Sequence, residues 1–531
     1  MMGLVSGSEI LDLDRSIGIP SPVLMESAGA AVASIITELF SIQEKTRVLV
    51  VCGPGNNGAD GLVVARRLAA VARGWSISVL LVGEMKSEEG RKNLNLLEKF
   101  GIAFTDIASA NVDEFDVIVD GLLGAGSRAG IPEKYERLIN SMNFISAKNK
   151  RNECKIISID IPSGVCPTSG RALIPNPIQA HITVTFGLIK SGLVFYPGRR
   201  YGGKLILSNI SYPHVFSGKN LSTWVNPVPL LNYRNDSGHK GSFGKGLFVA
   251  GSNEYFGAPF FASLAFLKAG GGYSRLSTSA AVASVVAIGA PEVVMVPEES
   301  YSKYLTESDV IVVGPGLGLS EKADFKLKAI LDASIPAIPI VIDGDALNLL
   351  KTLDRLEKSL GKGSTVVLTP HKGEWIRLFS DQVEDVDEKI SDYHMIMETR
   401  RVIKRFETLP GELIVVCKGP STGIVSSKPN GAVFVNLSGN PNLATCGSGD
   451  VLAGLIAALL CNPPGVQGSG ESVYFSAVGA AVFIHGLASD LGPQGAPMTA
   501  SDVMNNVPEA VRLCLKDPQS LRAKYVPRLV V

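Results

Sequence analysis

The sequence predicts an α/β protein of two domains, each built on a sheet with helices packed against it. Two observations lead to this prediction. With 531 residues, the chain is too long for one ordinary hydrophobic core. Short apolar runs also alternate with helical stretches along most of the chain. Continuous apolar strands separated by helices are typical of parallel sheets that are covered on both faces.

In the first half, each apolar run ends at a loop that contains glycine or aspartate. We expect strands at Arg47–Cys52, Ile77–Val82, Asp116–Val119, Lys155–Ile159 and Ile182–Phe186. Small and aliphatic residues over Val23–Phe40 predict an amphipathic helix that packs on this sheet.

A segment rich in Pro, Asn, Ser and Gly, at residues 213–240, interrupts this pattern. We therefore place the first domain at residues 1–218 and the second at 222–531. In the second half we expect strands at Gly246–Ala250, Val293–Val296, Val310–Val313, Pro339–Ile342, Thr365–Leu368 and Leu413–Val416. A helix at Gly449–Leu460 and an apolar stretch at Ser472–Ala488 complete this half.

Composition argues against several classes of partner. Lys+Arg and Asp+Glu number 50 each, so no net charge attracts the chain to nucleic acid or to an anionic membrane. Seven cysteines without a CxxC pair favour a reducing cytoplasm over a disulfide framework or a zinc site. The N-terminus does not resemble a secretory signal. Apolar stretches such as Leu452–Cys461 are shorter than the roughly 20 residues of a membrane span. We expect a soluble, cytoplasmic protein.

A glycine loop at residues 53–61, GPGNNGADG, joins the first expected strand to a helix. Glycines permit tight turns and close approach of a ligand, and the free N–H groups at a helix start favour phosphate. Gly53, Gly55 and Gly58 fit the spacing GxGxxG, with Glu84 as a possible ribose ligand. That spacing alone fits a dehydrogenase, or a turn that merely closes a strand onto a helix.

Polar residues at three strand ends favour a more specific site. Asn56, Asn57 and Asp60 lie in the glycine loop, Asp120 follows the third strand, and Asp160 with Ser163 follows the fourth. Each aspartate alone could be a helix cap. Together, carboxylate, amide and hydroxyl oxygens at one sheet edge suit a hard cation.

These segments resemble the signature motifs of the NAD(P)H-hydrate epimerase family, over about residues 1–215. The resemblance implies a Rossmann-like, three-layer fold and a potassium ion held by Asn57, Asp120 and Ser163. It also implies that Asp160 is the acid/base. Substrate contacts are implied for Asn56, Asn57, Gly58, Ala59, Asp60, Gly124, Ala125, Gly126, Ser127, Arg128, Ala129, Gly130 and Asp160.

Epimerisation requires loss and return of hydroxide at one ring carbon, which a carboxylic group can support without a redox cofactor. Ala59 departs from the family, which usually has glycine there, and its methyl could crowd the phosphate. The alternative for this half is a silent binding module, since the same fold serves as a scaffold in mRNA-decapping proteins. Retention of Asp160 argues against that alternative.

The most specific motif is Gly447-Ser448-Gly449-Asp450, followed by the apolar run VLAGLIAALL. The turn enters a helix directly, so backbone N–H groups form an anion hole for a phosphoryl group. Asp450 lies in the first turn, where it can take a proton from an attacking hydroxyl. An aspartate that is simply favoured by the helix dipole is the alternative.

This motif resembles the ribokinase-like superfamily, and five further segments resemble its NAD(P)H-hydrate dehydratase family, over about residues 225–515. The segments are His239–Lys245, Gly314–Gly318, Asp343–Asn348, Thr369–Glu374 and Lys418–Gly419. The resemblance implies that Asp450 is the base. It implies ADP contacts at Lys418, Gly419, Pro420, Ser421, Thr422, Gly447, Ser448 and Gly449, and contacts to the hydrate at Gly316, Leu317, Gly318, His371 and Asp450.

Several of these residues have structural alternatives. His371 could be an ordinary loop histidine, Asp343 and Asp345 could cap strand ends, and Lys240 could be solvated. Cys446 stands where the family commonly has glycine, and its side chain could narrow the nucleotide pocket or pack inward.

The fusion of the two activities is itself informative. An epimerase before an epimer-selective dehydratase repairs both forms of hydrated NADH and NADPH. The dehydratase would consume ADP, with ATP as the other candidate donor and Mg²⁺ carried by the nucleotide, and would release AMP and phosphate. Two alternatives remain: a ribokinase-like small-metabolite kinase with a non-catalytic N-terminal module, and a nicotinamide-binding sensor. We also expect a homo-oligomer.

Overall fold

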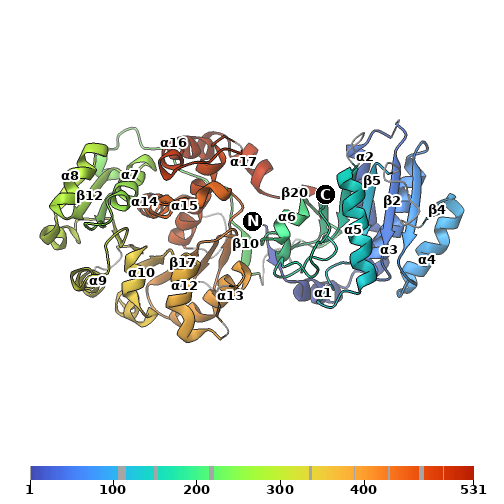
Figure 1. The fold of residues 1–531 in the computed structure, drawn as a ribbon, viewed down its shortest axis with the longest axis horizontal. Helices are drawn as coiled ribbons and strands as arrows, with labels where there is room; N and C mark the ends of the chain where they lie inside the picture. Colours follow the sequence, from blue (N-terminus) through green and yellow to red (C-terminus); the bar gives the residue numbers. More distant parts are fainter. Residues whose placement is uncertain are drawn as a thin grey trace. The chain divides into compact units, whose positions relative to one another are not determined.

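The computed structural model describes residues 2–530, except 43, 106–114, 149–153, 214–220, 334–337, 385, 388, 429–430, 466–471 and 494. The chain forms two compact units, one of residues 2–221 with Pro527–Val531 and the other of Ser222–Val526. The expected end of the first domain, at 218, lies outside the described residues. Figure 1 shows the elements of both units, coloured along the chain.

The N-terminal unit is built on a parallel sheet with the strand order β20-β9-β7-β6-β5-β2-β3-β4. Its strands are β2 (Arg47–Cys52), β3 (Ser76–Leu81), β4 (Ala103–Phe104), β5 (Val117–Gly121), β6 (Lys155–Ile159), β7 (Ile182–Phe186), β9 (Lys204–Ser208) and β20 (Arg528–Val530). A short parallel pair joins β1 (Leu4–Val5) to β8 (Ile189–Lys190). The expected strands of this half are all present, within two residues of their predicted bounds.

Helices cover both faces of this sheet. They are α1 (Gly7–Ser16), α2 (Ser21–Leu39), α3 (Asn56–Val71), α4 (Glu88–Leu97), α5 (Glu133–Lys148) and α6 (Gly198–Gly202). In β2, Val48 and Val50 face the core shared with α2 and α3, whereas Leu49 and Val51 face the core shared with α5. A strand buried on both faces has no polar side, which explains its continuous apolar run. The predicted α/β class is confirmed.

The last strand corrects the expected extent of the second domain. We assigned residues 527–531 to that domain, whereas β20 pairs in parallel with β9 of the N-terminal unit. Arg528 also forms an ion pair with Glu38 of α2, at 2.8 Å between Nη1 and Oε1. A parallel pairing between residues more than three hundred positions apart leaves no local signal in the sequence.

The C-terminal unit contains a mixed sheet with the order β10-β19-β18-β17-β16-β15-β14-β11-β12-β13. Its strands are β10 (Thr223–Val225), β11 (Lys245–Val249), β12 (Tyr273–Thr278), β13 (Val294–Pro297), β14 (Val310–Val313), β15 (Ile340–Ile342), β16 (Thr365–Leu368), β17 (Glu412–Cys417), β18 (Gly423–Ser426) and β19 (Val433–Val435). Among the described strands of this sheet, the pairs β17–β18 and β18–β19 are antiparallel and the others are parallel. The short strands β10, β18 and β19 and the six-residue strand β12 were not anticipated.

The helices of this unit are α7 (Gly257–Lys268), α8 (Ala280–Gly289), α9 (Glu321–Ala333), α10 (Asp345–Leu350), α11 (Glu357–Gly361), α12 (Lys372–Phe379), α13 (Asp392–Ile403), α14 (Ser448–Cys461), α15 (Val473–Asp490), α16 (Ala500–Lys516) and α17 (Pro518–Tyr525). The predicted helix at 449–460 is α14. It is apolar on all sides because it lies inside the core, packed against α7 and α15. Its N-terminus is therefore held firmly in place.

Two helices, α2 and α15, are long and apolar enough to cross a membrane by length and composition. Both helices are longer than the apolar stretches that we expected from the sequence. Helix α15 is a core helix, since 78% of its apolar window is buried inside the unit. Helix α2 buries one face, including Val32 and Ile36, in the core that it shares with α3.

Candidate active sites

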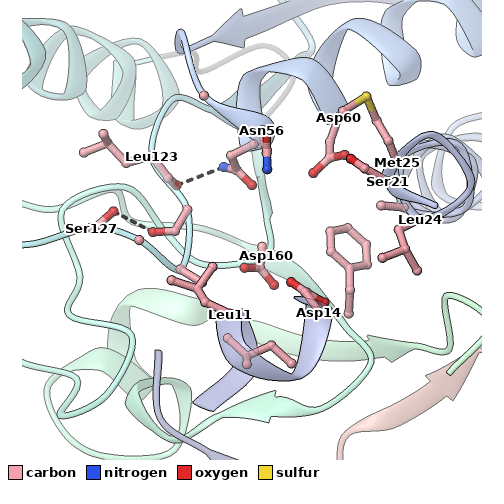
Figure 2. A pocket seen from close by; sticks show the side chains of 18 of the residues that line it. Leu11, Asp14, Ser21, Leu24, Met25, Asn56, Asp60, Leu123, Ser127 and Asp160 are labelled. Atoms are coloured by element: carbon pink, nitrogen blue, oxygen red, sulfur yellow. Dashed lines mark hydrogen bonds between the residues drawn. The ribbon is translucent and has the colours of Figure 1, made fainter. Parts of the chain in front are cut away.

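A cavity of about 810 Å³ lies at the carboxyl ends of strands in the N-terminal sheet, beside α1, α2 and the start of α3 (Figure 2). Ligands of open α/β sheets bind at this edge. The residues that the sequence places here and that line the cavity are Asn56, Asn57, Asp60, Gly124, Ala125, Gly126, Ser127 and Asp160. The lining does not include Gly58, Ala59, Arg128, Ala129 or Gly130.

Gly58 and Ala59 have packing roles instead. A Cβ on Gly58 would lie 1.8 Å from the carbonyl oxygen of Gly53, so only glycine lets α3 start this close to the loop. Ala59 is fully buried and packs with Met25 and Val63. Its methyl therefore does not narrow the cavity, and the departure from glycine at this position is accommodated by packing.

The three residues expected to bind potassium lie together around the backbone of Leu123. Ser163 Oγ donates to Asp120 Oδ1 at 2.6 Å and accepts from Leu123 N at 2.9 Å. Asn57 Nδ2 donates to the carbonyl oxygen of Leu123 at 2.9 Å. Asp120 is fully buried, and burial raises the pKa of its carboxyl although hydrogen bonds from Ser163 and Ser158 oppose that effect.

This donor set fits a monovalent cation. It offers one carboxylate charge together with neutral hydroxyl, amide and carbonyl oxygens, which are hard ligands. A divalent cation in a cage made only of protein atoms generally has more carboxylates than this. No cluster of three or more His, Cys, Asp or Glu side chains suited to a metal occurs among the described residues.

Asp160 follows β6 directly and has a left-handed backbone with φ of 66°. Its Oδ1 accepts from Lys190 Nζ at 2.5 Å and from Thr185 Oγ1 at 3.2 Å. The Lys190 side chain is only 3% exposed and also donates to the carbonyl oxygen of Phe186 at 3.0 Å. Asp160 is thus a buried, ion-paired carboxylate that borders the cavity.

Sequence reasoning missed Lys190 and Thr185. The one available signal was a lysine in the otherwise uncharged stretch Ile182–Leu193, a place where a buried charge needs a partner. Two more unanticipated residues complete this wall, since Tyr212 OH donates to Asp14 Oδ1 and both line the cavity. Burial raises the pKa of the Asp14 carboxyl, and the hydrogen bond from Tyr212 opposes it.

In the C-terminal unit, α14 begins at the glycine motif that the sequence singled out. Gly447 precedes the helix with φ of 90°, a conformation that favours glycine. A Cβ on Gly449 would lie 3.3 Å from Lys418 Nζ, so this glycine brings the helix start close to that lysine. Ser448 is buried, and its Oγ lies 3.3 Å from Nε2 of His485, whose pKa burial lowers to about 4.

Acidic side chains surround Lys418 beside this turn. Its Nζ lies 3.0 Å from Asp343 Oδ1 and 4.0 Å from Glu374 Oε2. Asp343 also accepts a hydrogen bond from Thr369 Oγ1 at 2.6 Å. Burial, reinforced by Asp343, raises the pKa of Asp450 to about 7, although Lys418 acts in the opposite direction. Asp450 therefore has a pKa suited to a general base near neutral pH.

His371 caps α12 through its side chain. Nδ1 accepts from the backbone N–H groups of Gly373 at 3.0 Å and Glu374 at 3.3 Å. The remaining nitrogen, Nε2, lies 3.4 Å from Glu374 Oε1 in a side chain that is 57% exposed. Burial, followed by nearby Lys418 and Arg377, lowers the pKa of His371. His371 is thus a helix cap whose exposed edge stays free to meet a ligand.

The loop of Gly316, Leu317 and Gly318 is fixed by an aspartate. Gly316 and Gly318 have φ of 60° and 78°, and Gly318 N donates to Asp345 Oδ2 at 2.8 Å. Leu317 is buried, at 5% exposure. Asp345 therefore positions the loop, while Asp343 binds Lys418, so neither is an isolated strand-end cap.

The expected nucleotide segment, Lys418 to Thr422, is held by Asp392, which sequence reasoning missed. Ser421 N donates to Asp392 Oδ2 at 2.8 Å, and Thr422 Oγ1 donates to the Gly419 carbonyl at 3.0 Å. Pro420 lies within the same turn. Asp392 is the first residue of α13 and carried no motif in the sequence.

Asp490 anchors the chain that leads into the glycine motif. It accepts from Gly439 N and Asn440 Nδ2, both at 2.8 Å, and from Tyr525 OH at 2.9 Å. Cys446 is exposed, so its side chain does not pack inward.

Comparisons with known proteins agree in both units. Residues 247–508 match the NAD(P)H-hydrate dehydratase family, and residues 21–192 match the family of YjeF-related protein N-termini. A bifunctional NAD(P)H-hydrate repair enzyme Nnr from Thermofilum pendens is 37% identical, over 98% of this chain and 99% of the relative. The enzyme of the same name from Moorella thermoacetica is 33% identical, over 99% and 100%.

A crystal structure of an ADP/ATP-dependent NAD(P)H-hydrate dehydratase from Bacillus subtilis, co-crystallised with ATP and Mg²⁺, is 24% identical with a TM-score of 0.43. The match covers 56% of this chain and 100% of that one.

Proposed function

The chain belongs to the bifunctional NAD(P)H-hydrate repair enzymes, and on this premise we propose which residues carry its two activities. One activity interconverts the R and S epimers of hydrated NADH and NADPH. The other dehydrates the S epimer in a reaction driven by ADP or ATP with Mg²⁺. We assign the first activity to the cavity of the N-terminal unit and the second to the start of α14.

In the epimerase, Asp160 is the acid/base at the hydrated ring carbon. Its Oδ1 is held by Lys190 and Thr185, so its second carboxylate oxygen is the one available to the substrate. Asn56, Asn57, Asp60 and the segment 124–127 are the proposed substrate contacts. All of these residues line the cavity, which supports this assignment.

Potassium is proposed for the oxygen cluster of Asn57, Asp120 and Ser163. Beside the cavity, a bound cation would supply positive charge that attracts an oxyanion or a water. The donor chemistry supports this: the cluster has a single carboxylate whose oxygens already converge with neutral donors.

In the dehydratase, Asp450 takes the proton of the ring hydroxyl as that oxygen attacks the terminal phosphoryl group of the nucleotide. The resulting phosphate ester is a far better leaving group than hydroxide, and its elimination restores the reduced ring. Gly447 and Gly449 would offer N–H groups to the phosphoryl oxygens, whereas the N–H of Ser448 donates to the carbonyl oxygen of Thr445 at 3.3 Å. Lys418 adds a cation beside Gly449. The single observation that carries this proposal is Asp450, with a pKa near 7, in the first turn of a buried helix next to that lysine.

The remaining contacts in this unit are proposed on the resemblance. The segment Lys418, Gly419, Pro420, Ser421 and Thr422 binds the nucleotide. The loop of Gly316, Leu317 and Gly318, with His371, contacts the hydrate. ADP rather than ATP is the proposed donor, giving AMP and phosphate, and Mg²⁺ arrives with the nucleotide. A cytoplasmic location and a homo-oligomeric state are likewise proposals.

The test uses a chemically prepared mixture of both NADH-hydrate epimers with K⁺, Mg²⁺ and either ADP or ATP. Recovered NADH is followed by its near-ultraviolet absorbance. We expect full recovery of both epimers with the wild-type chain, and faster recovery with ADP. Asp450→Ala abolishes recovery, whereas Asp160→Ala slows only the R epimer, to its spontaneous rate of epimerisation.

Replacing K⁺ with Na⁺ should slow recovery of the R epimer alone, because potassium is assigned only to the epimerase. If no NADH appears with either nucleotide, the dehydratase assignment to Asp450 is wrong. The hypothesis to test for the C-terminal unit would then be a small-metabolite kinase.

A further inference from the structure

Three carboxylates from different elements border the epimerase cavity. Asp14 comes from α1, Asp60 from α3, and Asp160 follows β6. Figure 2 shows the carboxylate of Asp60 apart from that of Asp160, with open space between the two side chains. A ring bound in this space would therefore meet a carboxyl group on more than one side.

The three groups are held differently. Asp160 is ion-paired with Lys190, and Asp14 accepts a hydrogen bond from Tyr212. The carboxylate of Asp60, by contrast, has no hydrogen bond or ion pair with any residue that the structure describes. Burial, and then the neighbouring Asp160 and Asp14, raise the pKa of Asp60 well above its ordinary range, although Lys190 opposes them from a distance.

The reaction needs two complementary proton transfers. When the hydroxyl leaves, the carbon–oxygen bond breaks, the oxygen takes a proton and departs as water, and the ring nitrogen's electron pair forms a carbon–nitrogen double bond. When water adds, its oxygen bonds to the same carbon, the pair returns to nitrogen and a proton is released. Inversion requires departure from one face and addition to the other, so one group must hold a proton while another lacks it.

Resting on the epimerase function, we propose that Asp60 is the second acid/base group of this site, acting on the ring face opposite to Asp160. In one direction, neutral Asp60 protonates the departing hydroxyl and ion-paired Asp160 accepts the proton of the incoming water. In the other direction, the two carboxyl groups exchange roles. Each turnover moves one proton from one aspartate to the other, and bulk water restores the starting state.

The arrangement of the cavity supports this division of labour. Lys190 lies against Asp160 and no cation contacts Asp60 among the described side chains, so one carboxylate has a counter-ion and the other does not. Without a counter-ion, a carboxyl group among other carboxylates favours the protonated form. Two carboxyl groups with different surroundings are a general means of providing an acid and a base at one pH.

The test follows each purified epimer in ¹⁸O-labelled water with K⁺ and without nucleotide. Inversion and incorporation of ¹⁸O are measured together by chromatography and mass spectrometry. In the wild-type chain, we expect label to appear with inversion. Asp60→Asn should reduce inversion about a hundredfold or more. It should also leave an asymmetry, because the epimer whose hydroxyl faces Asp160 still exchanges oxygen with retained configuration while the other epimer is inert.

Asp12→Asn is the matched control, because Asp12 lies on α1 and is 75% exposed, outside the cavity lining. It should behave as the wild type. Unchanged dehydration of the S epimer by Asp60→Asn, with nucleotide added, shows that the chain is folded. Wild-type inversion in Asp60→Asn, or equal loss of inversion and exchange for both epimers, overturns the proposal. Absence of inversion in the wild type would instead reject the epimerase function itself.

Discussion

The two units each place an aspartate and a lysine at their site, yet they pair them differently. In the N-terminal unit, Lys190 contacts Asp160 directly, at 2.5 Å. In the C-terminal unit, Lys418 lies 3.0 Å from Asp343, while Asp450 remains close enough for its pKa to be affected by both. The same two residue types therefore produce an ion-paired carboxylate in one site and an unpaired one in the other.

This difference matches the two chemistries. A hydroxyl attacking phosphorus gives its proton to a base, and a base with a pKa near the working pH serves this step best. The pKa of Asp450 is raised first by burial and then by the charge of Asp343, while Lys418, which contacts Asp343, only partly opposes these two effects. In the proposed epimerase reaction, protons must be both given and taken, and Asp160, paired with Lys190, would provide one half of that exchange.

The largest effect should come from removing the direct pair. Lys190→Met leaves Asp160 buried without its cation, which costs about 3 kcal/mol in comparable buried pairs. We expect epimerisation to fall about a hundredfold or more, with dehydration of the S epimer unchanged. Hydrogen exchange at β6 and β7 measures the loss of stability, and epimer chromatography measures the rate.

Arg15→Met is the control for that substitution. Arg15 also lines the cavity, but its side chain is 79% exposed and its ion pair with Asp12 is on the surface. Exposed ion pairs contribute at most about 1 kcal/mol. If both substitutions destabilise β6 and β7 equally, the buried pair is not what distinguishes this site.

An intermediate effect concerns the pH dependence of the dehydratase. Asp450 must be ionised to act as a base, so kcat/KM should decline as the pH falls through its pKa of about 7. Asp345 raises that pKa, and Asp345→Asn removes its charge while an amide oxygen can still accept from Gly318 N. The acidic limb of the profile should therefore move to lower pH, by less than about one unit.

A pH profile that stays the same in Asp345→Asn would show that its charge does not reach Asp450. An upward shift would contradict the sign of the interaction. The epimerase measured on the same samples provides the reference, because Asp345 belongs to the other unit.

The sequence allowed most of the buried central strands of both sheets and the residues at their carboxyl ends to be predicted, because buried strands leave apolar runs and glycine loops leave motifs. It did not predict β4, β9, β10, β12, β18, β19 or β20. It did not reveal Lys190, Thr185 or Asp392, which act through tertiary contacts and belong to no recognised motif. The pairing of β20 with β9 was also hidden, since a parallel contact at that sequence separation has no local pattern.

The same limit applies to protonation. Sequence reasoning identified Asp160 and Asp450 but could not say which would find a cation, because that depends on whether another carboxylate reaches the lysine first. Asp343 reaches Lys418, and no acid competes in this way for Lys190 among the described contacts. The two sites contain the same residue types and differ in which aspartate forms an ion pair with the lysine.

The smallest effect is expected at Cys446, which precedes the anion-hole glycine and stands where the family commonly has glycine. Its side chain is exposed, and its backbone is not among the positive-φ positions, so the structure does not require glycine there. Cys446→Gly should change the KM for nucleotide by less than about threefold, which corresponds to less than about 0.7 kcal/mol. A larger fall in KM would mean that the thiol narrows the nucleotide site. Lys418 and Asp450 keep their contacts in this variant, so the pH profile of dehydration should stay unchanged. A change in KM without a change in this profile would show a steric effect at the phosphate site and not an electrostatic effect on the pKa of Asp450.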